Sequence, residues 1–98
     1  TVSDTEGNVL YMNDKAAEVF GSMVGKNMMG CHKASSQEII GRLIANAETN
    51  AYTIEKGDVK KIIYQTPWYK DGEVAGLVEF SFVIPFEMPH YVRTPKAE

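Results

Sequence analysis

The alternation of apolar and polar side chains is strongest toward the C-terminal end of the chain, in residues 60–85. Two runs rich in β-branched and aromatic residues, which favour strands, make up this stretch: KKIIYQTPWYK and EVAGLVEFSFVIP. Asp71-Gly72 lies between them and signals a tight turn, because glycine accepts the positive φ that such a turn needs. The pattern therefore predicts a long β-hairpin around which the rest of the chain is arranged.

Side chains point alternately to the two sides of a strand, so this hairpin has two unlike faces. We call the almost wholly apolar side the aromatic face, and its members are Ile62, Tyr64, Thr66, Trp68, Val78, Phe80, Phe82 and Ile84. We call the other side the mixed face, and its members are Lys61, Ile63, Gln65, Pro67, Leu77, Glu79, Ser81 and Val83. An antiparallel sheet usually has one solvated face, so the pattern alone favours the aromatic face as the core. The alternative is the reverse, with the mixed face buried.

The first 21 residues predict a smaller hairpin followed by a short helix. Residues 4–7 supply turn formers between a strand that ends at Ser3 and a return strand over residues 9–12. Asn13 or Asp14 can cap the helix, because their side chains accept hydrogen bonds from the free amides of its first turn. Gly21 ends it. The helical spacing of three apolar residues predicts that they are buried: Ala16, Val19 and Phe20.

The middle of the chain predicts further helices and one more strand. Glycines divide residues 22–34 into short pieces, which favours one-turn helices. Ser35 or Ser36 can cap a longer helix whose apolar face consists of Ile39, Ile40, Leu43, Ile44 and Ala47. Gly41 inside this helix would permit a close approach to the sheet. Residues 51–58 read as a strand and a turn that lead into the long hairpin.

This order of elements predicts an α+β domain. Strands at both ends of the chain, with helices in the middle, indicate a five-stranded antiparallel sheet with short helices and one longer helix over one face. We expect the domain to span residues 1–86. Residues 87–98 contain two prolines and are expected to form a tail, linker or docking arm in which Tyr91 and Val92 pack locally.

Composition narrows the possible partners and the compartment. The chain of 98 residues is 44% hydrophobic and 23% charged, which is ordinary for a globular domain. Its net charge of −3, without a basic stripe, argues against a nucleic-acid partner. A single cysteine fits a reducing compartment, so we expect the cytoplasm. No apolar run approaches the ~20 residues of a membrane span. The chain begins with Thr1 and not with Met, as expected of a fragment of a longer protein.

Three stretches of sequence carry a resemblance to a known family. TVSDTEGNVLYMNDKAAEVFG at the start and YKDGEVAGLV near the end resemble a PAS domain, and the resemblance covers nearly the whole chain. GKNMMGCHKASS is similar to a bacterial PAS subgroup, often found beside hemerythrin-like domains, in which a Cys-His dipeptide is usually followed by prolines. Cys31 and His32 match the dipeptide, whereas Lys33 and Ala34 replace the prolines. Glu79 matches a glutamate that the subgroup tends to carry in the final strand.

The resemblance implies that the mixed face lies under the helices and lines a cavity. The residues then expected to bind a ligand are Cys31, His32, Tyr52, Ile63, Gln65, Leu77, Glu79 and Ser81. The outer face is then expected to pair two copies or to contact an effector domain, through Tyr64, Trp68, Val78, Phe80 and Phe82. The expected function is a sensory or signalling PAS module that binds a small ligand and dimerises. The alternative is a structural dimerisation module with a filled core and no ligand.

The chemistry of the Cys31-His32 pair has three interpretations. Adjacent residues cannot easily present both side chains to one tetrahedral metal, and no second pair with ligand spacing follows, so a metal site is not expected. In the simplest interpretation, His32 is hydrogen-bonded at a helix start and Cys31 is a small buried hydrophobe. In the third, His32 faces the cavity and pairs with Glu79. If Glu79 points inward without His32, its reachable partners are Gln65, Ser81 and Tyr52.

Cofactors and catalysis receive little support from the sequence. The arginine and glutamine that follow the cysteine of flavin photosensors are missing, so flavin is not expected. Heme-binding PAS domains take their axial histidine from the long helix, and this helix has none. The expected ligand is therefore a small organic molecule, or none. An enzyme is not expected, because no set of nucleophile, base and orienting residue and no phosphate loop is apparent.

Overall fold

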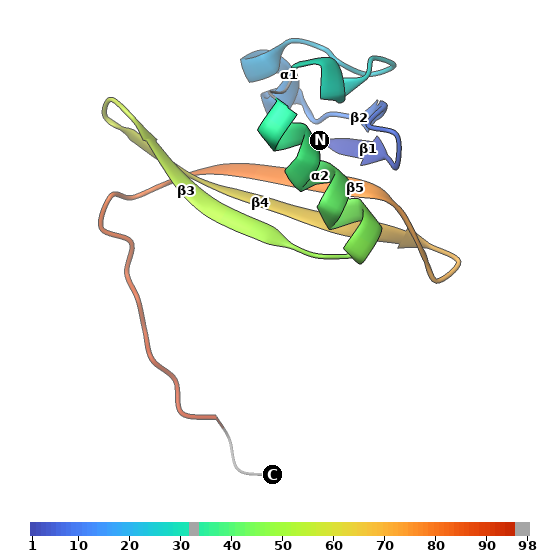
Figure 1. Ribbon diagram of the computed structural model, residues 1–98. Helices are drawn as coiled ribbons and strands as arrows, with labels where there is room; N and C mark the ends of the chain where they lie inside the picture. Colours follow the sequence, from blue (N-terminus) through green and yellow to red (C-terminus); the bar gives the residue numbers. More distant parts are fainter. Residues whose placement is uncertain (32–33, 96–98) are drawn as a thin grey trace.

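The fold is an open antiparallel sheet with helices on one side (Figure 1). The computed structural model describes residues 1–31 and 34–95. The strands are β1 (Val2–Asp4), β2 (Val9–Tyr11), β3 (Asn50–Lys56), β4 (Val59–Lys70) and β5 (Glu73–Ile84), and their order in the sheet is β2-β1-β5-β4-β3. The predicted α+β class with a five-stranded antiparallel sheet is confirmed.

The long hairpin forms as predicted and is the centre of the sheet. β4 and β5 pair from Lys60 opposite Ile84 to Lys70 opposite Glu73. Asp71 and Gly72 both have positive φ, 53° and 81°, which is the backbone twist that suits a two-residue hairpin turn. The local sequence signal was therefore sufficient to define this element.

The N-terminal hairpin and the short helix after it also follow the sequence. The Asp4 carboxylate accepts hydrogen bonds from the backbone N–H groups of Glu6 and Asn8, both at 2.9 Å, and so holds the first turn. Helix α1 (Asp14–Phe20) is capped by Asn13, whose side chain accepts from the N–H of Ala16 at 2.9 Å. Of the two predicted caps, Asn13 is the one used.

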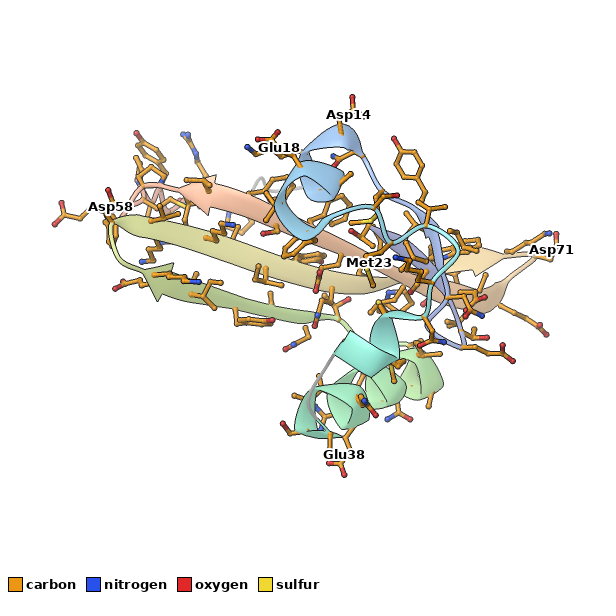
Figure 2. The ribbon with its side chains drawn as sticks, turned by 90° about the horizontal axis from the view of Figure 1, so that it is seen from above. Asp14, Glu18, Met23, Glu38, Asp58 and Asp71 are labelled. Atoms are coloured by element: carbon orange, nitrogen blue, oxygen red, sulfur yellow. The ribbon has the colours of Figure 1, made fainter. Side chains whose placement is uncertain are left out.

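The predicted burial of α1 is wrong. No residue of the helix is buried, and Val19 and Phe20 are 48% and 57% exposed. Figure 2 looks down on the helices and shows why: α1, marked by Asp14 and Glu18, lies on the β5 side of the sheet, away from α2. Its apolar residues therefore face a hollow instead of the core.

The core forms where the longer helix meets the sheet. Helix α2 (Ala34–Asn46) buries Ile40 and Leu43 against Leu77 of β5. A 3-10 turn, η1 (Met28–Cys31), precedes it, and Met28, Met29 and Ile44 pack around this cluster. Long, unbranched and flexible methionine side chains suit such an irregular gap.

Two details predicted for α2 are wrong. Ser35 and Ser36 lie inside the helix, which begins at Ala34, so neither is the cap. A Cβ atom built on Gly41 would meet nothing within 4 Å, so this glycine faces open space and permits no close approach to the sheet. The close approach occurs instead at Gly76 of β5, where the same atom would lie 1.8 Å from the Ser3 carbonyl oxygen.

The helices cover the mixed face, contrary to what the pattern alone favours. Ile63, Gln65 and Leu77 are 8%, 5% and 2% exposed, whereas Tyr64, Phe80 and Phe82 of the aromatic face are 40%, 42% and 54% exposed. The turn at Asp58 extends beyond both helices (Figure 2). For this reason the far end of the mixed face stays open.

The chain leaves the domain after β5. Residues 85–95 form no helix or strand, and Figure 1 shows them running away from the sheet on the side opposite the helices. Tyr91 makes a local contact, since the guanidinium carbon of Arg93 lies 5.4 Å from the centroid of its ring, whereas Val92 is 88% exposed and its predicted local packing is wrong. The tail leaves this apolar surface in water.

Candidate functional site

A row of polar side chains crosses the covered face of the sheet at one level. Asn50, Gln65 and Glu79 are direct neighbours on β3, β4 and β5, because the strand register sets them opposite one another. Asn50 Nδ2 donates to Gln65 Oε1 at 3.1 Å, and Gln65 Nε2 donates to Glu79 Oε1 at 2.7 Å. We call these three residues the polar row. Its central amide is buried and uses both its donor and its acceptor, which fixes its orientation.

The partner of the inward carboxylate is therefore Gln65. This residue is one of the three that the sequence offered as partners, together with Ser81 and Tyr52. A short bond to a charged acceptor is about twice as strong as a neutral one. The predicted pairing of His32 with Glu79 lies outside the described residues, as does every prediction for His32, and the side chain of Cys31 is not described.

The space enclosed next to the polar row is small. A void of about 10 Å³ lies between the row and the helices, and its lining residues are Thr1, Ser3, Met28, Ile40, Gln65, Leu77 and Glu79. A site of this size has room for roughly one water molecule. An organic ligand would need this part of the core to open.

One level further along the covered face, Tyr52 lies opposite Ile63, and Ile63 lies opposite Ser81. Burial raises the pKa of the Tyr52 phenol above its usual value, and the negative charge of Glu79 raises this pKa further. The phenol therefore stays protonated and can donate a hydrogen bond to an incoming group. The predicted ligand-binding residues on the strands thus share one face, with their polar groups close to Glu79.

A larger hollow lies along β5, beside helix α1. It has a volume of about 530 Å³ and lies between α1, which contributes Lys15, Val19 and Phe20, and residues 78–83 of β5. Lys61 of β4 also lines it. We call it the edge groove. It contains side chains from both faces of the sheet, because it runs along the edge of a strand and not across one face.

The aromatic face is a third surface with a chemistry of its own. The rings of Tyr64 and Phe80 are tilted with centroids 6.5 Å apart, and those of Phe80 and Phe82 are stacked at 5.7 Å. Trp68 has a separate role, since its indole Nε1 donates to the Ser3 carbonyl oxygen at 2.8 Å and ties β1 to the hairpin. Of the residues predicted at a dimer interface, Tyr64, Phe80 and Phe82 are therefore the most accessible.

Sequence reasoning missed two parts of these sites. The sequence pattern predicted that the third strand begins at residue 51, whereas Asn50 is its first residue and pairs opposite Gln65. Two amide side chains on neighbouring strands could have indicated the hydrogen bond between them. The α1 wall of the edge groove was assigned to the core, because a helical apolar pattern does not say which neighbour covers it. Only the position of α1 beside β5 reveals the groove.

Metal and membrane chemistry receive no support from the part of the chain that is described. Within residues 1–31 and 34–95, no three His, Cys, Asp or Glu side chains are grouped so that they could hold a metal ion. None of the helices in the same ranges is long and apolar enough to cross a bilayer. Comparison of the chain with protein-family models, with curated proteins and with solved structures finds no match.

Proposed function

We propose that this chain is a PAS-like signalling module that pairs with a second copy through its aromatic face. The observation that carries this proposal is the exposed ring cluster of Tyr64, Phe80 and Phe82 on a sheet whose opposite face is covered by helices. A contiguous apolar patch of this kind on a soluble domain commonly marks an interaction site. The sheet with helices over one face is the arrangement that the resemblance to PAS domains implies, and it supports the proposal.

The second copy is the partner that best fits this surface. No member of the aromatic face carries a charge, and the charged residues beside it on the same side of the sheet, Lys60 and Glu55, are direct neighbours of opposite sign. Twofold dimers use one patch on both subunits, and aromatic rings that are already stacked lose little side-chain freedom when covered. A cytoplasmic setting suits the single cysteine of the chain.

The dimer is tested by sedimentation velocity over a concentration series, with Tyr64→Glu as the disrupting variant. Its control is Ile54→Glu, since Ile54 has a similar exposure, 44% against 40%, but lies on β3 facing the other side of the sheet. We expect the wild type and Ile54→Glu to dimerise, and Tyr64→Glu to sediment as a folded monomer with unchanged circular dichroism. A wild type that stays monomeric, or a Tyr64→Glu dimer of unchanged affinity, would contradict the proposal.

A second candidate function is the binding of a small ligand by the same module. Ligand pockets commonly have volumes of roughly 300–1,000 Å³, and the edge groove falls in this range. Its lining combines aromatic side chains with Lys61, Glu79 and Ser81, which offer both hydrogen-bond donors and acceptors. Native mass spectrometry of protein purified from cells tests this function: a retained small molecule supports sensing, and an empty chain favours the purely structural dimerisation module.

A further inference from the structure

The outer edge of β3 is unpaired along its whole length. β3 is the last strand of the sheet, and residues 50–56 pair with β4 on one side only. Every residue from Ala51 to Lys56 is exposed, and no strand within residues 1–31 and 34–95 pairs with the far side of β3. The chain begins at Thr1 beside β5, and β4 separates β5 from β3. The edge therefore offers a full strand for pairing.

The hydrogen bonds of β5 show which backbone groups of β3 face outward. Glu79 donates its N–H to the Thr1 carbonyl at 2.9 Å and accepts from the Thr1 amino group at 3.1 Å, on the side away from β4. Gln65, opposite Glu79, therefore directs its N–H and C=O toward β3, where Asn50 lies opposite. Because this direction alternates along a strand, three residues of β3 direct their N–H and C=O groups outward: Ala51, Thr53 and Glu55.

These outward groups match those of a second copy. When two β3 strands run antiparallel with Thr53 opposite Thr53 of the second copy, each outward residue faces another outward residue, and Ala51 faces Glu55. Each of the three pairs then exchanges two backbone hydrogen bonds. A shift by two residues in either direction keeps only two of these pairs. The central register therefore satisfies the edge most completely, and it relates the two copies by a twofold axis.

The apolar side chains of β3 favour the same register. On the side of the sheet that carries the helices, Tyr52 lies opposite Ile54 of the second copy, and Ile54 lies opposite its Tyr52. Aromatic and β-branched side chains stabilise an antiparallel pair when they lie opposite one another. Tyr52 and Ile54 are 43% and 44% exposed in the single chain, so both gain cover from the pairing. Either shifted register would set Lys56 opposite Tyr52, or Asn50 opposite Ile54.

The charges on β3 do not oppose this pairing. Glu55 faces Ala51 of the second copy and Lys56 faces its Asn50, so no two like charges lie directly opposite one another. Strand edges that avoid association carry prolines, bulges or charges along the strand. The central residues 51–54 contain no proline and no charge, and their register with β4 has no bulge. The edge is therefore free to accept a strand.

We propose that β3 of one copy pairs antiparallel with β3 of a second copy, with Thr53 at the twofold axis, and joins the two five-stranded sheets edge to edge. The aromatic faces of both copies then lie on the same side and stay uncovered. The edge pairing therefore goes beyond the proposed function. A single pair of strands is a small interface, so it forms at higher concentration than the aromatic-face dimer and joins such dimers to one another.

Disulfide trapping tests the register. The chain carries Cys31→Ala, so that the introduced cysteine is the only one, and Tyr64→Glu, which removes the aromatic-face dimer. Thr53→Cys sets two thiols opposite one another, with Cα atoms about 5.5 Å apart, which is within the range of a disulfide. Ala51→Cys is the matched control, because it lies on the same side of β3 but faces Glu55 of the second copy.

We expect Thr53→Cys to form a covalent dimer under mild oxidation roughly tenfold faster than Ala51→Cys, because only its two thiols are held within reach of each other. Equal rates for the two variants, or no covalent dimer from Thr53→Cys, would overturn the pairing.

Amide hydrogen exchange tests the outward backbone groups. In the ¹⁵N-labelled Tyr64→Glu chain, protection of the Ala51, Thr53 and Glu55 amides should rise severalfold as the concentration approaches the millimolar range. Tyr52 and Ile54 already donate to β4, so their protection should not change. A rise without this alternation, or no rise, would contradict the proposal.

Sedimentation velocity separates the two interfaces. At high concentration wild-type dimers should associate further, whereas Ile54→Glu should stop at the dimer, because it loses the contact with Tyr52 and sets two carboxylates diagonally across the strand pair. If the aromatic-face dimer fails and the edge pairing holds, the pattern is reversed: Tyr64→Glu dimerises and Ile54→Glu stays monomeric. Identical association of the wild type and Ile54→Glu at every concentration would refute the edge pairing.

Discussion

Gly76→Ala is the substitution for which the structure makes its sharpest prediction, and Gly41→Ala is its matched control. Both exchange a glycine for an alanine inside a regular element. At Gly41 the new methyl group would meet open space, whereas at Gly76 it would lie 1.8 Å from the Ser3 carbonyl oxygen and 2.6 Å from Trp68 Nε1. We therefore expect the two substitutions to change stability in opposite directions.

The size of the effect at Gly76 follows from what must move. Contacts to a Cβ atom under 3.0 Å essentially do not occur, so the Ser3 carbonyl must retreat by about 1.2 Å, the difference between 3.0 and 1.8 Å. Its hydrogen bond from Trp68, now 2.8 Å, is then lost, and the pairing of β1 with β5 shifts. At about 1 kcal/mol for the indole bond and a similar amount for each of two ladder bonds, the cost is about 3 kcal/mol.

Urea and thermal unfolding measure both variants. For a domain of this size we expect Gly76→Ala to lower Tm by roughly 12–24 °C. Gly41→Ala should stabilise the protein by about 1 kcal/mol, because alanine is the better helix former. A neutral or stabilising Gly76→Ala would refute the close contact of β1 with β5.

Two further predictions concern the polar row and its neighbour. Gln65→Leu leaves Glu79 without its hydrogen-bond donor and Asn50 without its acceptor. We therefore expect urea unfolding to show a loss of about 2 kcal/mol in the free energy of unfolding. A loss within experimental error would show that water replaces the amide fully. Glu79→Gln should lower the raised pKa of Tyr52 only in part, because burial is the larger cause of the shift. NMR titration of ¹³C-labelled tyrosine measures this pKa. An unchanged pKa would show that the two side chains are too far apart to interact. Because the phenol pKa is raised in the folded state, the unfolded chain releases its proton first, and the free energy of unfolding falls as the pH rises above the usual tyrosine value of 10.0. Glu79→Gln should reduce this loss of stability at alkaline pH.

The polar row and the edge groove are connected through Glu79. This carboxylate accepts from Gln65 on the covered side and also lines the groove, and its backbone marks the last position paired with the start of β1. A molecule in the groove therefore contacts a side chain that is hydrogen-bonded to the buried Gln65. Occupation of the groove would change the environment of Glu79, and through this carboxylate its hydrogen bond with Gln65 and the pKa of Tyr52.

Local physical chemistry in the sequence determined the elements and their order. The alternation in residues 60–85 and the Asp71-Gly72 turn were sufficient for the hairpin, because side-chain periodicity and a positive-φ glycine act over neighbouring residues only. The Asn13 cap and the first turn at Asp4 are equally local. The residues of the polar row on the long hairpin could be assigned to one face by counting along the strands.

The alternation of apolar and polar residues could not decide which face of the hairpin is buried. Period two defines an aromatic face and a mixed face, yet it does not say which one a helix covers, and the more apolar face is the one left exposed. That outcome depends on where the connection from β2 to β3 places α2. Ile40 and Leu43 meet Leu77, so the buried surface is set by a contact between residues that lie far apart in the chain.

The same distinction applies to the glycines and to the edge groove. Gly41 and Gly76 each stand inside a predicted helix or strand, and nothing in the sequence distinguishes their roles. Gly76 cannot be replaced without strain because the Ser3 carbonyl of the neighbouring strand β1 lies against it. The groove exists because α1 stands beside residues 78–83 of β5, a position that the sequence of the helix does not reveal. The sequence by itself determined which segments are strands and helices. Packing between residues that lie far apart in the chain decided which face of the sheet the helices cover and where α1 and β5 enclose a groove.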